Sequence, residues 1–96
     1  MEENKYYIVR GQYSGVFAGF ISKRNGREVT LNNVRRLWYW EGAQTISQLA
    51  SSGTMKADEC KFSVPIQEMT VLDAVEIDAC TEIARISIQG VYEWKI

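Results

Sequence analysis

The dipeptide Asn25-Gly26 is the strongest local constraint on how this chain can fold. It separates two segments rich in β-branched and aromatic residues, Val16–Lys23 and Glu28–Leu31. Asn and Gly readily adopt the positive φ angles of a type I′ turn, and the twist of that turn matches the twist of two antiparallel strands. The sequence therefore predicts a β-hairpin whose two strands are joined by Asn25-Gly26.

Further strands are predicted where apolar and polar residues alternate, or where β-branched and aromatic residues gather. These segments are Tyr6–Arg10, Val34–Trp40, Cys60–Val64, Met69–Ile77 and Val91–Lys95. Asn32-Asn33 interrupts the apolar pattern, so a short break is expected between Glu28–Leu31 and Val34–Trp40.

Two helices are predicted from capping residues. Thr45 begins the first helix, because Thr45-x-x-Gln48 has the spacing of a capping box, and Gly53 suits its end. Thr81 begins the second helix, and Gly90 ends it. The apolar residues expected on the buried side of the second helix are Ile83, Ala84, Ile86 and Ile88.

This order of elements favours an α+β fold, a small antiparallel β-sheet or partly open barrel with two short helices. A chain of 96 residues is long enough for one hydrophobic core and too short for two. We therefore expect a single domain over residues 1–96, in which residues 1–4 are candidates for a flexible end.

The composition argues against several classes of function. The chain has no histidine, and Cys60 and Cys80 are its only cysteines, so no catalytic residue, metal site or cofactor is predicted. No segment approaches the ~20 apolar residues of a membrane span. The polar, acidic start Met1–Asn4 is unlike a secretion signal. We expect a cytoplasmic protein that does not enter membranes, with both cysteines as free thiols rather than as a disulfide.

Charge is distributed unevenly along the chain. The net charge is −1, but residues 1–48 carry +3 and residues 49–96 carry −4. This excess of positive charge is too small for a double-stranded nucleic acid partner, but it suits a small anion or the acidic half of a neighbouring copy. A homo-oligomer is therefore expected. Lys23, Arg24 and Arg27 surround the hairpin turn, where they either keep the protein soluble or contact a polyanion.

The segment Val34–Trp40 combines arginines with aromatic residues and is the candidate binding site. Side chains alternate along a strand, so Arg36, Trp38 and Trp40 are expected on one face and Arg35, Leu37 and Tyr39 on the other. Aromatic rings stack on nucleotide bases, and guanidinium groups bind phosphate. The helix that begins at Thr45 directly follows, and free backbone amides at such a helix start favour anions. The predicted ligand-binding residues are Arg35, Arg36, Trp38, Tyr39, Trp40, Gly42, Ala43 and Thr45.

A purely structural interpretation of the same segment stays open. Trp38 and Trp40 are then core residues on one face of a sheet, Arg36 forms a salt bridge at its edge, and Gly42 supplies a turn. Asp73, Glu76 and Asp78 are also acidic neighbours, but strand alternation places Asp73 opposite the other two, which favours a solvated edge over a cation site.

The most specific motif of the chain is the run Asn33–Ala43, followed by Ser47–Ala50, Gly53 and Cys60–Phe62. With these residues, most of the chain resembles a family of small uncharacterised proteins from tailed bacteriophages and prophages. The resemblance implies a phage-encoded accessory protein in the bacterial cytoplasm, and it transfers no catalytic residue. Small phage proteins of this kind often counter host defence.

Two functions from different classes follow. The leading hypothesis is non-enzymatic binding and sequestration of a nucleotide-like signalling ligand as a phage counter-defence protein. The alternative is a protein–protein inhibitor or assembly factor that binds a host or phage protein, such as a host defence protein, through its aromatic strand without a small ligand. An enzyme acting on nucleotides is the least supported hypothesis, because no suitable base or nucleophile is paired in the sequence.

Overall fold

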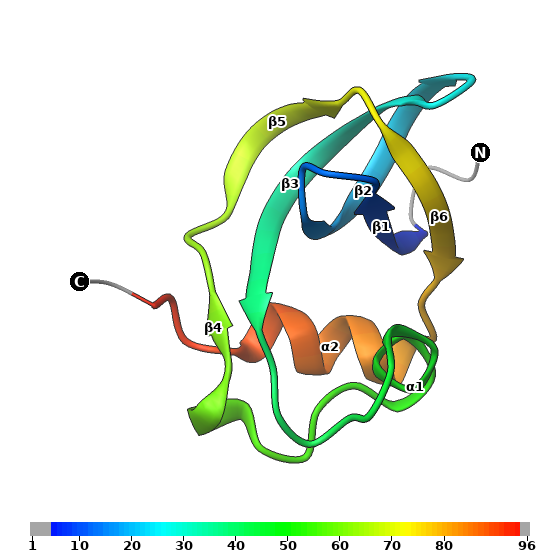
Figure 1. The fold of residues 1–96 in the computed structure, drawn as a ribbon. Helices are drawn as coiled ribbons and strands as arrows, with labels where there is room; N and C mark the ends of the chain where they lie inside the picture. The colour runs from blue at the N-terminus through cyan, green and yellow to red at the C-terminus, as the bar shows by residue number, and fades with distance from the viewer. Residues whose placement is uncertain (1–4, 95–96) are drawn as a thin grey trace.

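The hairpin predicted at Asn25-Gly26 is present in the computed structural model, which describes residues 5–94 (Figure 1). The fold is α+β, as predicted, with an antiparallel, partly open sheet and two helices. The strands are β1 (Tyr6–Gly11), β2 (Val16–Asn25), β3 (Glu28–Tyr39), β4 (Lys61–Phe62), β5 (Ile66–Val71) and β6 (Ala74–Ala79). The helices are α1 (Ile46–Ser52) and α2 (Glu82–Gly90), with a 3-10 turn at Ala57–Glu59.

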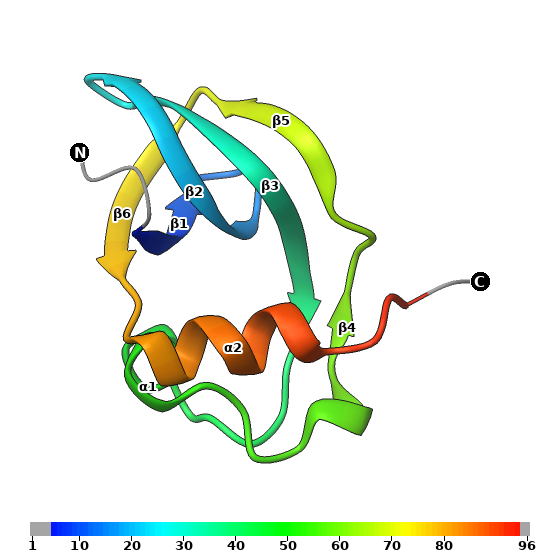
Figure 2. The same cartoon turned by 180° about the vertical axis from the view of Figure 1, so that it is seen from behind.

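The sheet curves until it resembles an open barrel. Its strand order is β4-β3-β2-β1-β6, and β5 pairs with the first half of β3 while β4 pairs with its end. Figure 1 and the reverse view in Figure 2 show both helices at one end of the curved sheet. The curvature therefore creates two separate interiors, one inside the barrel and one between the sheet and the helices.

Each interior has its own hydrophobic core. The core between the sheet and the helices contains Tyr6, Ile8, Ala18, Leu37, Leu49, Ala50, Cys60, Phe62, Cys80, Ala84, Ile88 and Val91. The core inside the barrel contains Val9, Phe17, Ile21, Val29, Leu31, Val34, Val71 and Ala74. Neighbours in sequence such as Ile8 and Val9 thus belong to different cores, because successive side chains on a strand point to opposite faces.

The expected break at Asn32-Asn33 is a bulge within one continuous strand. Asn32 lies opposite Phe20 and Arg35 opposite Ala18, so β3 contains one more residue than β2 between these pairs. Asn33 accommodates the extra residue with a φ of 48°, which Asn tolerates better than most residues. The bulge places Leu31 and Val34 in the same core despite their odd spacing.

The single strand predicted at Met69–Ile77 is wrong. The chain turns a corner at Leu72-Asp73, which separates β5 from β6. The Asp73 carboxylate holds this corner by accepting hydrogen bonds from the backbone nitrogens of Tyr13 (2.8 Å) and Ser14 (3.1 Å). Residues on both sides of the corner have strand geometry, so their alternating pattern continues through it and hides the turn.

Three smaller predictions also need correction. The strand predicted at Cys60–Val64 is limited to Lys61–Phe62. The strand predicted at Val91–Lys95 is a single bridge between Phe62 and Glu93, and Lys95 lies outside the described residues, as do residues 1–4. Ile83 and Ile86 are exposed rather than buried. A short helix on one side of a sheet buries a narrow stripe, and Ala84 and Ile88 fill it.

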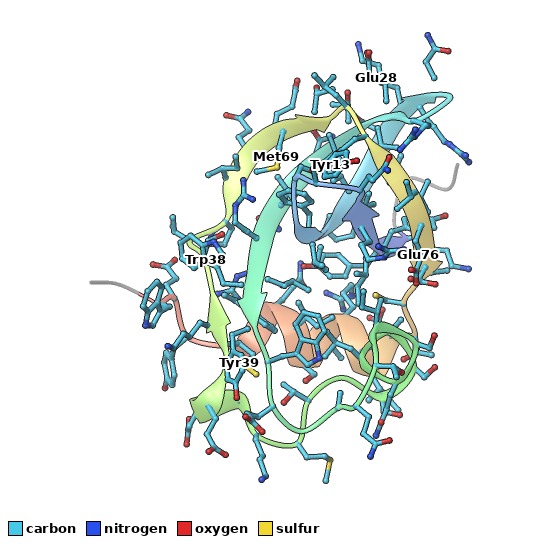
Figure 3. All side chains as sticks on the ribbon, in the orientation of Figure 1. Tyr13, Glu28, Trp38, Tyr39, Met69 and Glu76 are labelled. Carbon is cyan, nitrogen blue, oxygen red and sulfur yellow. The ribbon has the colours of Figure 1, made fainter. Side chains whose placement is uncertain are left out.

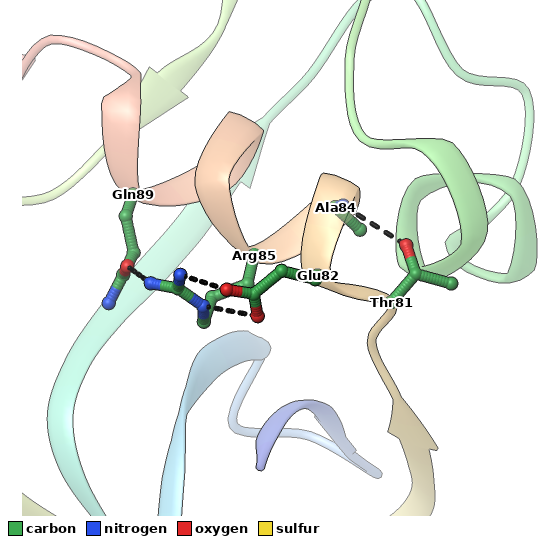
Figure 4. Close-up of polar contacts among 5 residues, drawn as sticks. All are labelled: Thr81, Glu82, Ala84, Arg85 and Gln89. Carbon is green, nitrogen blue, oxygen red and sulfur yellow. Dashed lines mark hydrogen bonds and ion pairs between the residues drawn. The ribbon is translucent and has the colours of Figure 1, made fainter. Parts of the chain in front are cut away.

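Both predicted helix caps are confirmed. Thr45 accepts from the backbone nitrogen of Gln48 (3.1 Å), although the Gln48 side chain returns to Gln44 rather than to the capping residue. Thr81 accepts from Ala84 (3.1 Å), and on the same helix Arg85 bridges Glu82 and Gln89 (Figure 4). These local bonds fix where each helix starts, as the sequence predicted.

The bulge gives a testable prediction. Asn33→Val should lower the free energy of unfolding by about 1–2 kcal/mol, because a β-branched residue disfavours positive φ. Asn32→Val is the matched control, since Asn32 is equally exposed but has no positive φ. It should change stability by less than about 0.5 kcal/mol in denaturant unfolding. Equal effects of the two changes would contradict the bulge.

Candidate functional site

Strand β3 directs the side chain of Arg35 into the core beneath the helices. Only 2% of this residue is exposed. Its Nε donates to the carbonyl of Ser63 (2.9 Å) and its Nη1 to the carbonyl of Ile88 (2.8 Å), while the guanidinium lies over the Phe62 ring. Two carbonyl groups and one aromatic ring of the protein thus contact the Arg35 guanidinium.

One nitrogen of this arginine remains without a partner. Arg35 Nη2 is buried and makes no hydrogen bond within residues 5–94, and the same holds for the buried hydroxyl of Tyr6. Both residues line a cavity of about 290 Å³ together with Asn33, Pro65 and Gln89. Buried polar groups almost always have partners, so two such groups at one cavity indicate a site for a hydrogen-bonding ligand or water.

A second cavity of about 470 Å³ lies beside the first. It shares Arg35, Pro65 and Gln89 with the inner cavity and extends along the C-terminal segment to Tyr92 and Glu93. Gln89 borders both spaces, and its side-chain oxygen accepts from Arg85 (2.6 Å), which leaves its amide nitrogen as a donor. The two cavities together form a site with a polar interior and an aromatic residue, Tyr92, at its exposed end.

The electrostatics of the inner cavity favour an anion. Burial lowers the pKa of Arg35, and the nearby Tyr6 and Glu93 oppose that shift, so the guanidinium stays charged at neutral pH. Burial also raises the pKa of Tyr6, which keeps its hydroxyl protonated and able to donate. A fixed positive charge beside a neutral donor is suited to holding an acidic group.

Arg36 lies on the other side of β3. Its guanidinium packs over the ring of Phe17 at 4.6 Å, and its Nη1 donates to the carbonyl of Ser14 (2.8 Å). It borders a separate groove of about 520 Å³ that Tyr13 and Leu72 flank. The two adjacent arginines therefore serve different spaces, in agreement with the expected alternation of faces.

The aromatic residues of the predicted site do not follow the expected alternation, because β3 ends at Tyr39 and Trp40 lies beyond it. Trp38 and Tyr39 are 54% and 45% exposed, whereas Trp40 is half-buried and packs against the core beneath the helices. Figure 3 shows Trp38 and Tyr39 at the outer edge of the molecule, near the end of β3. Trp38 is thus a surface residue, and the interpretation of it as a core residue does not hold.

The residues that follow β3 have structural roles. Gly42 has a φ of 83°, and a Cβ there would lie 2.6 Å from the backbone nitrogen of Met55. Ala43 packs against the core beneath the helices. Thr45 caps α1 by accepting from the backbone nitrogen of Gln48. The structure therefore does not bring Gly42, Ala43 and Thr45 to the cavity at Arg35.

The cavity instead gathers residues that sequence reasoning missed. Tyr6, Pro65 and Gln89 lie far from Arg35 in the sequence, and Asn33 was assigned only to a break. No local pattern links these positions, because they come from β1, the connection before β5, and α2. Only the strand order and the packing of α2 bring them together.

The two cysteines agree with the sequence analysis. Cys60 and Cys80 are buried free thiols. Burial raises the pKa of Cys80 to about 12, so this thiol is protonated at neutral pH. Within residues 5–94, no three His, Cys, Asp or Glu side chains lie close enough to hold a metal ion.

A carboxyl pair on β6 titrates unusually. Burial raises the pKa of Asp78 to about 6, and a hydrogen bond with Glu76 adds to the shift. The same hydrogen bond lowers the pKa of Glu76, which also pairs with Arg10 at 2.9 Å. The pair lies on β6, apart from Asp73, whose carboxylate holds the corner between β5 and β6.

The raised pKa of Asp78 predicts a pH effect on stability. Because the pKa of Asp78 is higher in the folded than in the unfolded chain, folding takes up a proton and the protein becomes more stable as pH falls from 7 to 5. Asp78→Asn should raise the melting temperature at pH 7 and reduce the rise between pH 7 and 5. Glu68→Gln, on exposed β5, is the control. An unchanged pH dependence in Asp78→Asn would contradict the assignment.

Neither helix in the described part of the chain is long and apolar enough to cross a membrane.

Comparisons with known proteins place the chain in a family. Searches of curated proteins and of solved structures give no match. A family model described as a domain of unknown function (DUF6948) matches residues 4–88, which is most of the chain. The chain therefore belongs to the family described as DUF6948, a domain of unknown function.

Proposed function

We propose that this domain binds a nucleotide-like small molecule without catalysis, with the anionic end of the ligand in the cavity at Arg35. The observation that carries the proposal is the pair of buried, unpartnered donors, Arg35 Nη2 and the Tyr6 hydroxyl, at one cavity. A phosphate oxygen in the cavity would supply the acceptor that these donors lack, once the side chains around them move to admit it. The bonds that Arg35 already makes to two carbonyls keep its remaining N–H group in place.

The adjoining space suits the rest of such a ligand. The two cavities measure about 290 and 470 Å³, and small-molecule sites are commonly about 300–1,000 Å³. Tyr92 is 85% exposed at the outer end and offers a ring for stacking on a base. Anion recognition inside and base recognition outside support a nucleotide over a simple inorganic anion.

We also propose a biological setting. The resemblance to small phage and prophage proteins supports a phage-encoded accessory protein in the cytoplasm of the host bacterium. Sequestration of a nucleotide signal there would weaken a host defence response. The opposite charges of the two halves of the chain, +3 and −4, support a homo-oligomer as the active form.

The first test concerns the stability of the empty protein. Tyr6→Phe removes only a buried hydroxyl that has no partner, so it should leave stability unchanged or raise it by up to about 1 kcal/mol. Denaturant unfolding measures this effect. A loss of more than about 1 kcal/mol would indicate that the hydroxyl bonds within the protein and is not available to a ligand.

The second test concerns binding. Calorimetry against cyclic and ADP-ribose-derived nucleotides should detect a ligand, and Tyr6→Phe should weaken its binding by about 10-fold, since a charge-assisted hydrogen bond contributes ~1.5–3 kcal/mol. Arg36→Gln is the matched control, because Arg36 borders a different groove, and it should leave affinity unchanged. The uncharged nucleosides should bind more weakly than their phosphates. No heat with any nucleotide, or loss of affinity in Arg36→Gln alone, would overturn the proposal.

A further inference from the structure

The end of β3 carries exposed aromatic side chains that cluster around a lysine. This cluster, here called the aromatic surface, is made up of Trp38, Tyr39, Lys61 and Trp94. The Trp38 and Trp94 rings meet edge to face at 5.1 Å. Lys61 Nζ lies 5.3 Å from the Trp94 ring centre and 5.9 Å from that of Tyr39, which joins the cluster into one unit. Exposed aromatic groups of this kind commonly mark contact sites for other macromolecules.

Acidic residues accompany the aromatic surface. The Tyr39 hydroxyl donates to Glu41, and Asp58 and Glu59 lie on the 3-10 turn just before β4, which begins at Lys61. Among the described residues of these segments, three acids outnumber the two lysines, Lys56 and Lys61, which disfavours nucleic acid as a partner. The acids also disfavour a symmetric dimer in which two aromatic surfaces face each other, because like charges would then be opposed. The surface therefore suits a narrow, positively charged segment.

The β2–β3 hairpin of the same chain has these properties. Lys23, Arg24 and Arg27 are exposed around its turn, against one acid, Glu28. Nothing lies within 4 Å of a Cβ built at Gly26, so the turn projects into open space. Figure 1 shows the hairpin extending beyond the sheet, and Figure 3 shows Glu28 at this tip on the opposite side of the molecule from Trp38 and Tyr39. A hairpin tip thus cannot reach the aromatic surface of its own chain.

We propose that the hairpin tip of one copy docks on the aromatic surface of a second copy. Lys23 and Arg24 would lie against Trp38, where cation–π contact and the accompanying acidic residues both favour them. Contacts between two different surfaces join copies head to tail, so repetition closes a ring or extends a chain. This association involves neither the cavity at Arg35 nor its ligand, and therefore does not depend on the proposed function.

Two variants with opposite defects give the sharpest test. Trp38→Ala removes the aromatic surface and keeps the tip, while the double change Lys23→Glu, Arg24→Glu reverses the tip and keeps the surface. All three positions are exposed, so both variants should fold. Ile83→Ala is the control, because it truncates an exposed apolar residue on α2.

Sedimentation equilibrium from micromolar to millimolar concentration measures the outcome. The wild type and Ile83→Ala should show a mass that rises above 11.0 kDa with concentration. Each defective variant should raise the dissociation constant by about 10-fold or more. An equal mixture of the two should form dimers and nothing larger, since each dimer uses the one intact tip and the one intact surface. A wild type that stays monomeric, or association unchanged by Trp38→Ala, would overturn the proposal and leave the surface to a different protein.

Discussion

The buried guanidinium of Arg35 connects α2 to β3 and to the segment after β4, two parts of the chain that backbone hydrogen bonds also join to each other. It reaches from β3 to the carbonyl of Ser63 after β4 and to the carbonyl of Ile88 in the last turn of α2. Removing a charge from water is costly, and these charge-assisted bonds together with the Phe62 ring offset that cost. A lysine could not replace this arginine, because one ammonium group cannot direct donors to two carbonyls and to a cavity at the same time. Hydrogen bonds from Thr54 and Thr81 also hold α2, but Arg35 fixes the last turn of this helix against β3, and with it the wall of the cavity.

The second constraint is that a sheet in so short a chain must be covered on both faces. The helices cover one face and the curvature of the sheet covers the other, so β1 and β2 carry apolar residues at consecutive positions, such as Ile8-Val9 and Phe17-Ala18. The end of β3 extends beyond both interiors, and there Trp38 and Tyr39 emerge into solvent. The same strand thus contributes an arginine to the core and aromatic rings to the surface.

Features of the fold that neighbouring residues determine could be predicted from the sequence, and features that distant residues determine could not. The hairpin at Asn25-Gly26 and the caps at Thr45 and Thr81 are set by neighbouring residues, and all three were predicted. The corner at Leu72-Asp73 is held by Asp73 bonds to residues about sixty positions away, so alternation alone misplaced it. The candidate site was found only at Arg35, because Tyr6 and Gln89 reach it through the strand order and helix packing, which no local pattern encodes.

The bulge at Asn33 has a consequence for how this strand can tolerate change over evolution. Every side chain of β3 beyond Asn33 has its inward or outward direction set by that one extra residue. If β3 ran through this point without the bulge, the two arginines would exchange faces, so that Arg36 would face the carbonyls now bound by Arg35 and Leu37 would turn away from the helices. Deleting Asn33 removes the extra residue and the bulge together, which leaves Leu31 and Val34 two positions apart and keeps both arginines on their present faces. Away from the bulge, a one-residue insertion or deletion acts as a frameshift in space and alters many contacts at once. The bulge is therefore a place where β3 can change its length by a single residue without turning its side chains over.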